Sequence, residues 1–174
     1  MKIGIILGST RKASKSTAIS EWILDKSKNE EAQFEIIDLV QYNLPFIGTS
    51  DDKSGVQKWD KKLMECDGFI FVTPEYNHSI SGALKNALDS AKSSWANKAA
   101  GIVSYGGSGG ARAAEHLRGI LAELQVATVR SHVLISTYDD FNDGIFKPRE
   151  SHNIKMDNLF KQTLSWSKAL KTVR

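Results

Sequence analysis

A loop near the N-terminus collects hydroxyl groups and cationic side chains where an apolar segment gives way to an amphipathic one. Free backbone amides and the helix dipole attract an anion at the start of a helix. Hydroxyls donate hydrogen bonds to phosphate oxygens, and an arginine can bind them with two parallel hydrogen bonds. The loop therefore predicts a site for a phosphate monoester. Five hydroxyls, one arginine and two lysines fall within its ten residues, Gly8-Ser9-Thr10-Arg11-Lys12-Ala13-Ser14-Lys15-Ser16-Thr17.

The loop does not match the two common glycine-rich phosphate motifs. Ala13 stands where the P-loop has its second glycine, and the dinucleotide fingerprint would need glycines at Thr10 and Ala13. Without those glycines the backbone is not expected to approach a pyrophosphate closely, so the side chains are predicted to hold a terminal monophosphate. The simpler alternative is a helix with a serine cap, which needs only one of the hydroxyls.

Two further loops are predicted to bind a flat ring. The loop from Thr73 to Gly82 places Tyr76 beside amide and backbone hydrogen-bonding groups, which suit the face and edge of a planar heterocycle. In the loop from Ser104 to Arg112, four of five consecutive residues are glycine, which leaves the backbone open to a large ligand. The alternatives are a tight polar turn for the first loop and a mobile loop without a ligand for the second.

Short apolar, β-branched runs alternate with amphipathic segments along the chain, and this pattern predicts an α/β domain with a doubly wound parallel sheet. Because ligands bind beyond the carboxyl ends of such strands, we expect the three loops to meet there, within one domain that spans residues 1–174. The predicted strands are Lys2–Leu7, Phe34–Asp38, Gly68–Thr73, Ala99–Tyr105 and Thr128–Ser136, and the predicted helices are Ser16–Ser27, Val56–Met64, Gly82–Ala91, Ala111–Leu124 and Asn153–Leu170.

Composition indicates a globular protein in a reducing compartment. Hydrophobic residues make up 41% of the 174 residues and charged residues 25%, and Cys66 is the single cysteine. The apolar run that ends at Gly8 is shorter than a signal peptide requires, and no segment is long enough to span a membrane. A net charge of +3 is too small to indicate nucleic acid as a partner. A cytoplasmic location is therefore expected, with neither membrane nor nucleic acid as a partner.

The three loops resemble those of the NADPH-dependent FMN reductase family, which includes flavin-dependent quinone, azo-dye and chromate reductases. The matching motifs are Gly8-Ser9-x-Arg11-x-x-Ser14, Pro74-Glu75-Tyr76-Asn77 with its continuation Gly82-Ala83-Leu84-Lys85-Asn86-Ala87-Leu88-Asp89, and the glycine loop through Arg112. The similarity covers roughly residues 3 to 125. It implies a flavodoxin-like fold with the strand order 2-1-3-4-5, bound FMN, and a homodimer or homotetramer.

The resemblance also implies how the cofactor is held and used. NAD(P)H would pass hydride to flavin N5 and leave before the acceptor enters, in a ping-pong cycle, and no side chain is assigned as a catalytic acid or base. The acceptor would be a quinone, an azo compound, chromate or free flavin. Many members of the family have asparagine where this chain has Ser16. Carried over by motif, the first loop would hold the FMN phosphate, the second would line the isoalloxazine largely through backbone groups, and the third would approach its pyrimidine side. The residues are Ser9, Arg11, Ser14, Ser16 and Thr17 for the phosphate, Pro74, Glu75, Tyr76 and Asn77 for the isoalloxazine, and Ser104, Gly106 and Gly107 for the pyrimidine side.

Two other functions are compatible with parts of the sequence. The glycine loop also satisfies Gly-x-Ser-x-Gly around Ser108, followed by Asp139 or Asp140 and then His152 in the order of an α/β-hydrolase. That reading leaves the loop around Arg11 without a role. The second alternative is a flavodoxin-type electron carrier without enzymatic activity, but such carriers are usually acidic and this chain has a pI near 8.9.

The remaining candidate residues are expected to have structural roles. The four histidines show no metal-ligand spacing with carboxylates or with Cys66, so no metal site is predicted. Cys66 is expected to be an inert small hydrophobe, and Lys85 and Asp89 are expected to pair along a helix. His78 is expected to face solvent. The tryptophans are expected in the core or at an interface, and Trp95 follows a helix from which it could reach the site of a neighbouring subunit.

Overall fold

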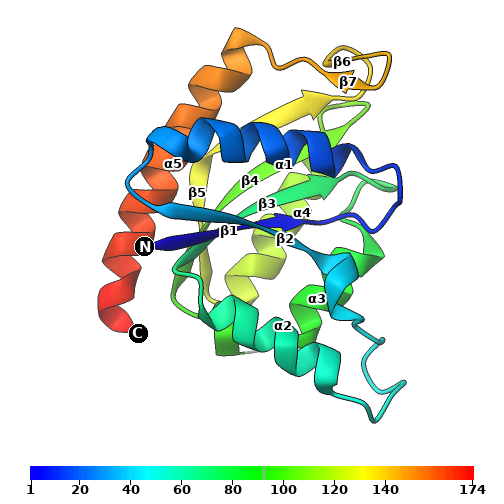
Figure 1. Cartoon of the computed structure of the whole chain (residues 1–174), viewed down its shortest axis with the longest axis vertical. Helices are drawn as coiled ribbons and strands as arrows, with labels where there is room; N and C mark the ends of the chain where they lie inside the picture. The colour runs from blue at the N-terminus through cyan, green and yellow to red at the C-terminus, as the bar shows by residue number, and fades with distance from the viewer. Residues whose placement is uncertain (92) are drawn as a thin grey trace.

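Five parallel strands form the central sheet of the computed structural model, which describes residues 1–91 and 93–174 (Figure 1). They lie in the order β2-β1-β3-β4-β5 and point their carboxyl ends toward one edge of the sheet. The predicted parallel sheet and its strand order are therefore confirmed. The strands are β1 (Lys2–Leu7), β2 (Gln33–Asp38), β3 (Gly68–Pro74), β4 (Lys98–Gly106) and β5 (Val126–Ser136).

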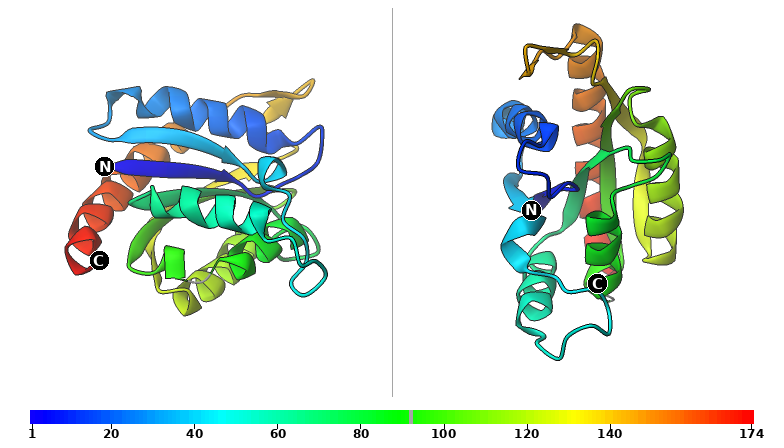
Figure 2. Two further views of the ribbon diagram at one scale, coloured as in Figure 1. Left: turned by 60° about the horizontal axis from the view of Figure 1, so that its bottom comes forward. Right: turned by 90° about the vertical axis from the view of Figure 1, so that its right-hand side faces the viewer.

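Helices cover both faces of the sheet, because the strand residues alternate between two apolar layers (Figure 2). Phe69 and Phe71 of β3 pack under α2 (Ser54–Met64), α3 (Gly82–Ser90) and α4 (Ala111–Glu123). Ile70 and Val72 face α1 (Lys15–Lys26) and α5 (Glu150–Leu170). Short 3-10 turns complete the fold at Ser27–Asn29, Leu39–Tyr42, Ser93–Trp95 and Lys171–Val173.

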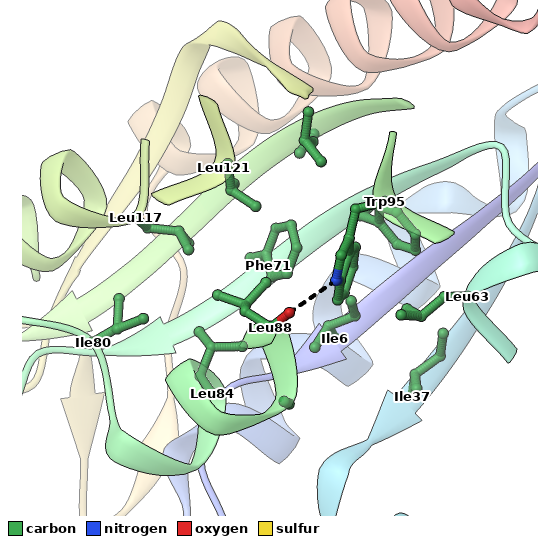
Figure 3. Packing of buried hydrophobic residues seen from close by; sticks show 14 of the residues in the cluster. Ile6, Ile37, Leu63, Phe71, Ile80, Leu84, Leu88, Trp95, Leu117 and Leu121 are labelled. Carbon is green, nitrogen blue, oxygen red and sulfur yellow. Dashed lines mark hydrogen bonds between the residues drawn. The ribbon is translucent and has the colours of Figure 1, made fainter. Parts of the chain in front are cut away.

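Aromatic and aliphatic side chains together fill the layer beneath α2 and α3, and Figure 3 shows Trp95 and Phe71 among leucine and isoleucine side chains. Trp95 is fully buried, and its ring centroid lies 5.1 Å from that of Phe69 and 5.8 Å from that of Trp59. Each indole nitrogen donates to a backbone oxygen of α3, Trp59 to Ala87 at 2.8 Å and Trp95 to Leu88 at 3.1 Å. Trp95 is therefore part of this chain's own core, one of the two places expected for the tryptophans, and its burial leaves it unable to reach the site of a neighbouring subunit.

A small antiparallel hairpin follows β5 and was not predicted. It comprises β6 (Phe141–Asn142) and β7 (Ile145–Phe146), with Asp143 and Gly144 at positive φ in the turn between them. The hairpin packs on α1, where Phe146 lies edge-on to Trp22 with ring centroids 5.5 Å apart. Two-residue strands are too short to show an alternating pattern, so only the Asp-Gly pair signals the turn.

The remaining boundaries differ from the predicted ones by a few residues at most. β3 extends to Pro74, β5 begins at Val126, and α5 begins at Glu150 rather than at Asn153. No helix among the described residues is long and apolar enough to cross a lipid bilayer.

Candidate functional site

The three loops predicted to meet do so at the carboxyl edge of the sheet. They enclose a cleft of about 300 Å³ between the ends of β1, β3 and β4. The first loop contributes its cationic and hydroxyl groups, the second contributes an aromatic ring, and the third contributes open backbone. The lining residues are Arg11, Ala13, Ser14, Lys15, Pro74, Glu75, Tyr76, Tyr105, Gly106, Gly107 and Thr137.

Hydroxyl groups of the first loop are bound to the start of α1 and to β4. The Ser14 hydroxyl caps α1 by accepting a hydrogen bond from the backbone amide of Ser16 at 3.1 Å. The Tyr105 hydroxyl lies 3.2 Å from Ser14 Oγ and 2.7 Å from Ser16 Oγ. Ser16 is fully buried, so its hydroxyl serves this contact with β4 and does not line the cleft.

The other residues of the first loop differ in exposure. Arg11 is exposed, lines the cleft, and pairs with no carboxylate among the described residues. Ser9 is buried, and its Oγ accepts from the Arg11 amide and lies 3.4 Å from the Tyr76 hydroxyl. Thr17 is exposed on the first turn of α1 and does not line the cleft. Arg11 and Ser14 are thus the predicted phosphate ligands that face the cleft directly.

Glu75 connects the second loop to the third. Its carboxylate accepts hydrogen bonds from the Arg112 amide at 3.1 Å and from Arg112 Nε at 2.5 Å, at the beginning of α4. Burial raises the pKa of the Glu75 carboxyl, but the hydrogen bonds from Arg112 outweigh it and leave the pKa below its usual value. The Glu75 amide donates to the Tyr105 carbonyl at 2.9 Å. The carboxylate and the backbone amide of Glu75 therefore both connect the second loop to the third.

A tight turn forms the tip of the second loop. The amide of Tyr76 donates to the Ser79 carbonyl at 2.9 Å, and the Ser79 amide donates back at 3.0 Å. Asn77 and His78 between them are exposed and have φ angles of 48° and 67°, the geometry of a two-residue hairpin turn. No acceptor among the described residues takes the amide hydrogens of Asn77 and His78. The turn thus presents two free donors at the end of the sheet.

Glycines of the third loop have two different uses. Gly110 has a φ of 75°, and a Cβ there would lie 2.7 Å from the Tyr105 nitrogen, so it permits β4 and α4 to approach closely. Ser104 is buried and donates to the Gly109 carbonyl at 2.9 Å, which fixes the turn from inside. Gly106 and Gly107 line the cleft and leave its wall free of side chains.

Four lining residues were not among the predicted ligands: Ala13, Lys15, Tyr105 and Thr137. The Lys15 ammonium lies 3.8 Å from the centroid of the Phe141 ring in the unpredicted hairpin. Tyr105 and Thr137 stand at the ends of β4 and β5, and their position after apolar runs was the only signal that could have found them.

The hydrolase alternative lacks its nucleophile–base pair. His152 is buried, its Nδ1 accepts from the Arg149 amide at 3.1 Å, and its Nε2 lies 3.6 Å from Asp140 Oδ2. Burial lowers the pKa of His152. No hydrogen bond joins Ser108 to His152 in the part of the chain that the structure describes. The contacts of His152 are thus with Arg149 and Asp140 in the region after β5, and it forms no described hydrogen bond that would activate Ser108.

Two structural expectations are confirmed outside the cleft. Lys85 Nζ lies 2.5 Å from Asp89 Oδ2 along α3. Cys66 is buried, and burial raises the pKa of its thiol to about 11, so the thiol stays protonated at neutral pH. Within the described residues no three His, Cys, Asp or Glu side chains gather in a way that could hold a metal ion.

Comparison with known proteins places this cleft in a family. A model of the NADPH-dependent FMN reductases matches residues 1–140. The chain is 39% identical over 129 residues to an NAD(P)H:quinone oxidoreductase of Solanum tuberosum, covering 69% of this chain and 66% of the relative. It is 34% identical over 135 residues to an NAD(P)H-dependent FMN reductase of Schizosaccharomyces pombe, covering 72% of this chain and 68% of the relative. The chain thus spans about two thirds of the length of these two relatives.

A solved structure agrees with this fold over the whole chain. The flavoenzyme FerB of Paracoccus denitrificans, an NAD(P)H:(acceptor) oxidoreductase, superposes with a TM-score of 0.78 at 22% identity and covers 97% of both chains. Three observations point to the same family: the strand order of the sheet, the meeting of the three loops at one cleft, and the match of the family model to residues 1–140. The chain belongs to the NADPH-dependent FMN reductase family, a family of flavodoxin-like oxidoreductases.

Proposed function

We propose that this chain binds FMN in the cleft and catalyses the NAD(P)H-dependent reduction of small acceptors such as quinones, azo compounds, chromate or free flavin. The observation that carries the proposal is the cleft itself. In it, the Arg11 guanidinium, which pairs with no carboxylate of the described residues, and the capped start of α1 face an aromatic ring and a wall of glycines. The names of the relatives, which include quinone oxidoreductases, FMN reductases and an NADPH azoreductase, support the same activity.

The residues of the cleft fit the two ends of FMN. Arg11, Ser14 and the amides at the start of α1 provide a cation and donors for the phosphate, with Ser9 and Thr17 beside them. At the other end, Gly106 and Gly107 leave room for a flat ring beside Tyr76. The amides of Glu75 and Tyr76 are already used within the protein, so the free amides of Asn77 and Gly107 are the donors proposed for the polar edge of the ring.

When bound, FMN supplies the redox chemistry, because it can take hydride from NAD(P)H and give it to an acceptor. The chain's contribution is to position the ring, to hold its phosphate, and to leave one side of the cleft open. Arg11 and Lys15 place two positive charges at the cleft and attract the phosphates of the nucleotide. We propose that nucleotide and acceptor use this open side in turn, which gives ping-pong kinetics without a catalytic acid or base from a side chain.

Purification and a visible spectrum test the proposal directly. We expect flavin absorption bands that bleach on addition of NADPH. We also expect steady oxidation of NADPH with menadione as acceptor, with parallel lines in double-reciprocal plots of the initial rate at different menadione concentrations. Bound flavin without turnover would favour the electron carrier instead. A colourless protein that takes up no FMN but hydrolyses a p-nitrophenyl ester, with activity lost in Ser108→Ala, would favour the hydrolase.

Arg11→Ala tests the phosphate loop. Loss of one charged contact to the phosphate is expected to weaken FMN binding by about 2 kcal/mol, somewhat more than tenfold. The measurement is a fluorescence titration of the apoprotein with FMN. Lys12→Ala is the matched control, since Lys12 is an exposed cation in the same loop that does not line the cleft. Equal FMN affinity in the Arg11 variant and the wild type would mean that the phosphate is held elsewhere.

The assembly and the location of the protein remain parts of the proposal. The family resemblance supports a homodimer or homotetramer whose subunits are each a single FMN-binding domain of residues 1–174. The cytoplasmic location is proposed from the sequence, which shows neither a signal peptide nor a membrane-spanning segment. Sedimentation of the purified protein would distinguish a monomer from either oligomer.

A further inference from the structure

Tyr138 is an exposed aromatic side chain at the rim of the cleft. It is 81% exposed, the highest fraction among the exposed large hydrophobic residues. Its ring lies against Gly107, because a Cβ on Gly107 would come within 3.0 Å of Tyr138 Cε2. Gly107 lines the cleft, and so does Thr137, the residue before Tyr138 in the chain. The ring therefore extends the glycine wall of the cleft outward into solvent.

The loop that carries Tyr138 is firmly held, so the exposure of the ring is not a consequence of a loose backbone. The Thr137 amide donates to the Gly106 carbonyl at 3.0 Å, which ties the loop to the end of β4. Asp140 is fully buried, and its carboxylate accepts from the Ser136 amide at 2.6 Å and pairs with Arg149 Nε at 2.6 Å. The amide of Tyr138 itself donates to Ser136 Oγ at 3.3 Å.

A ring held in this way can bind another flat ring at little entropic cost, because the loop is already ordered. Offset or edge-to-face contacts between aromatic rings add stability beyond the apolar area that they bury. The surroundings also limit the charge of the partner. Asp139 is exposed beside Tyr138, and the nearby Lys15 ammonium is already engaged over the Phe141 ring. An uncharged aromatic ring suits this end of the cleft better than a polyanionic nucleotide or an oxyanion.

We propose that Tyr138 binds the aromatic ring of the electron acceptor by stacking, and that it sets a preference for quinones and other aromatic acceptors over non-aromatic ones. The inference rests on the proposed function, because it names the acceptor class of the same cleft. Tyr138 acts here as a specificity-determining residue and takes no part in moving electrons or protons.

Kinetics of variants with two kinds of acceptor test this role. In Tyr138→Ala we expect the KM for menadione to rise about fivefold, whereas Tyr138→Phe keeps the ring and stays near the wild type. Reduction of ferricyanide, which has no aromatic ring, and the KM for NADPH should change less than about twofold in both variants. Trp166→Ala is the control for loss of an exposed aromatic, since Trp166 lies on α5 and does not line the cleft.

A binding measurement makes the test independent of turnover. Calorimetric titration of the oxidised protein, as purified, with menadione should give a Kd about fivefold weaker for Tyr138→Ala than for the wild type. Equal Kd values would overturn the inference, as would an equal loss with menadione and ferricyanide or a matching rise in the KM for NADPH. A wild type without flavin or turnover would refute the proposed function, and the titration would still decide whether Tyr138 binds an aromatic ring.

Discussion

Replacing Trp95 by alanine is expected to lower the free energy of unfolding by about 4 kcal/mol, the cost of emptying a large aromatic site in a close-packed core. Trp95 is fully buried and packs against Trp59, Phe69 and Phe71. The substitution also leaves the Leu88 carbonyl of α3 without its donor. Neighbouring aromatic rings are too rigid to fill the space that the indole leaves.

Urea denaturation followed by far-ultraviolet circular dichroism measures this effect without depending on tryptophan fluorescence. Trp166→Ala is the matched control, because Trp166 is 46% exposed on α5 and its loss should change stability by about 0.5 kcal/mol or less. If Trp95→Ala does not fold, Trp95→Phe keeps one ring of the site and should show a smaller loss in the same direction. Equal stability of the Trp95 and Trp166 variants would contradict the packing described for this core.

Gly110→Ala is expected to cost about 3 kcal/mol of stability and to reduce retention of FMN. Two causes add together. The residue has a φ of 75°, which disfavours any side chain, and the new Cβ would lie 2.7 Å from the Tyr105 nitrogen. Because the new Cβ would press on the backbone of Tyr105, the clash can be relieved only if β4 and the start of α4 move apart. Separation would displace Gly106 and Gly107 at the wall of the cleft.

Gly119→Ala is the control for this prediction. Gly119 lies inside α4, the helix that Gly110 immediately precedes, and a Cβ there would meet nothing within 4 Å. Alanine in a helix interior is favoured over glycine, so this variant should be more stable than the wild type by about 0.5–1 kcal/mol. The melting temperature should therefore fall in the Gly110 variant and rise in the Gly119 variant, and flavin content should fall only in the Gly110 variant. A Gly110 variant that behaves like the Gly119 variant would show that the close approach is not required.

The sheet was predictable because its strands are buried on both faces. Short continuous apolar runs such as Gly68–Thr73 are typical of strands buried in a parallel sheet, and each run is followed along the chain by a segment with helical spacing. The convergence of the three loops followed from that topology. The hairpin of β6 and β7 was not predictable from periodicity, since each strand contributes only two residues.

The hydrogen bonds between residues of the site could not be predicted from the sequence, for a different reason. Glu75 was expected to line the ring largely through its backbone, and no pattern in the sequence showed that its carboxylate is bound to Arg112, which is 37 residues away along the chain. Ser16 was expected to hold the phosphate, yet its hydroxyl is directed to Tyr105, 89 residues away. A motif indicates that such residues belong to one site. It does not tell which of them contact a ligand and which support the others, because that depends on partners brought together only by the fold.

Tyr105 occupies a position that gives the cleft a fixed length. Its hydroxyl is bonded to Ser14 and Ser16 at the start of α1, and its backbone carbonyl accepts from Glu75 in the second loop. One phenol ring therefore spans the distance between the start of α1 and the second loop. If FMN binds as proposed, with its phosphate at the first and its ring beside the second, this span requires a ligand of matching length as well as matching charge and shape.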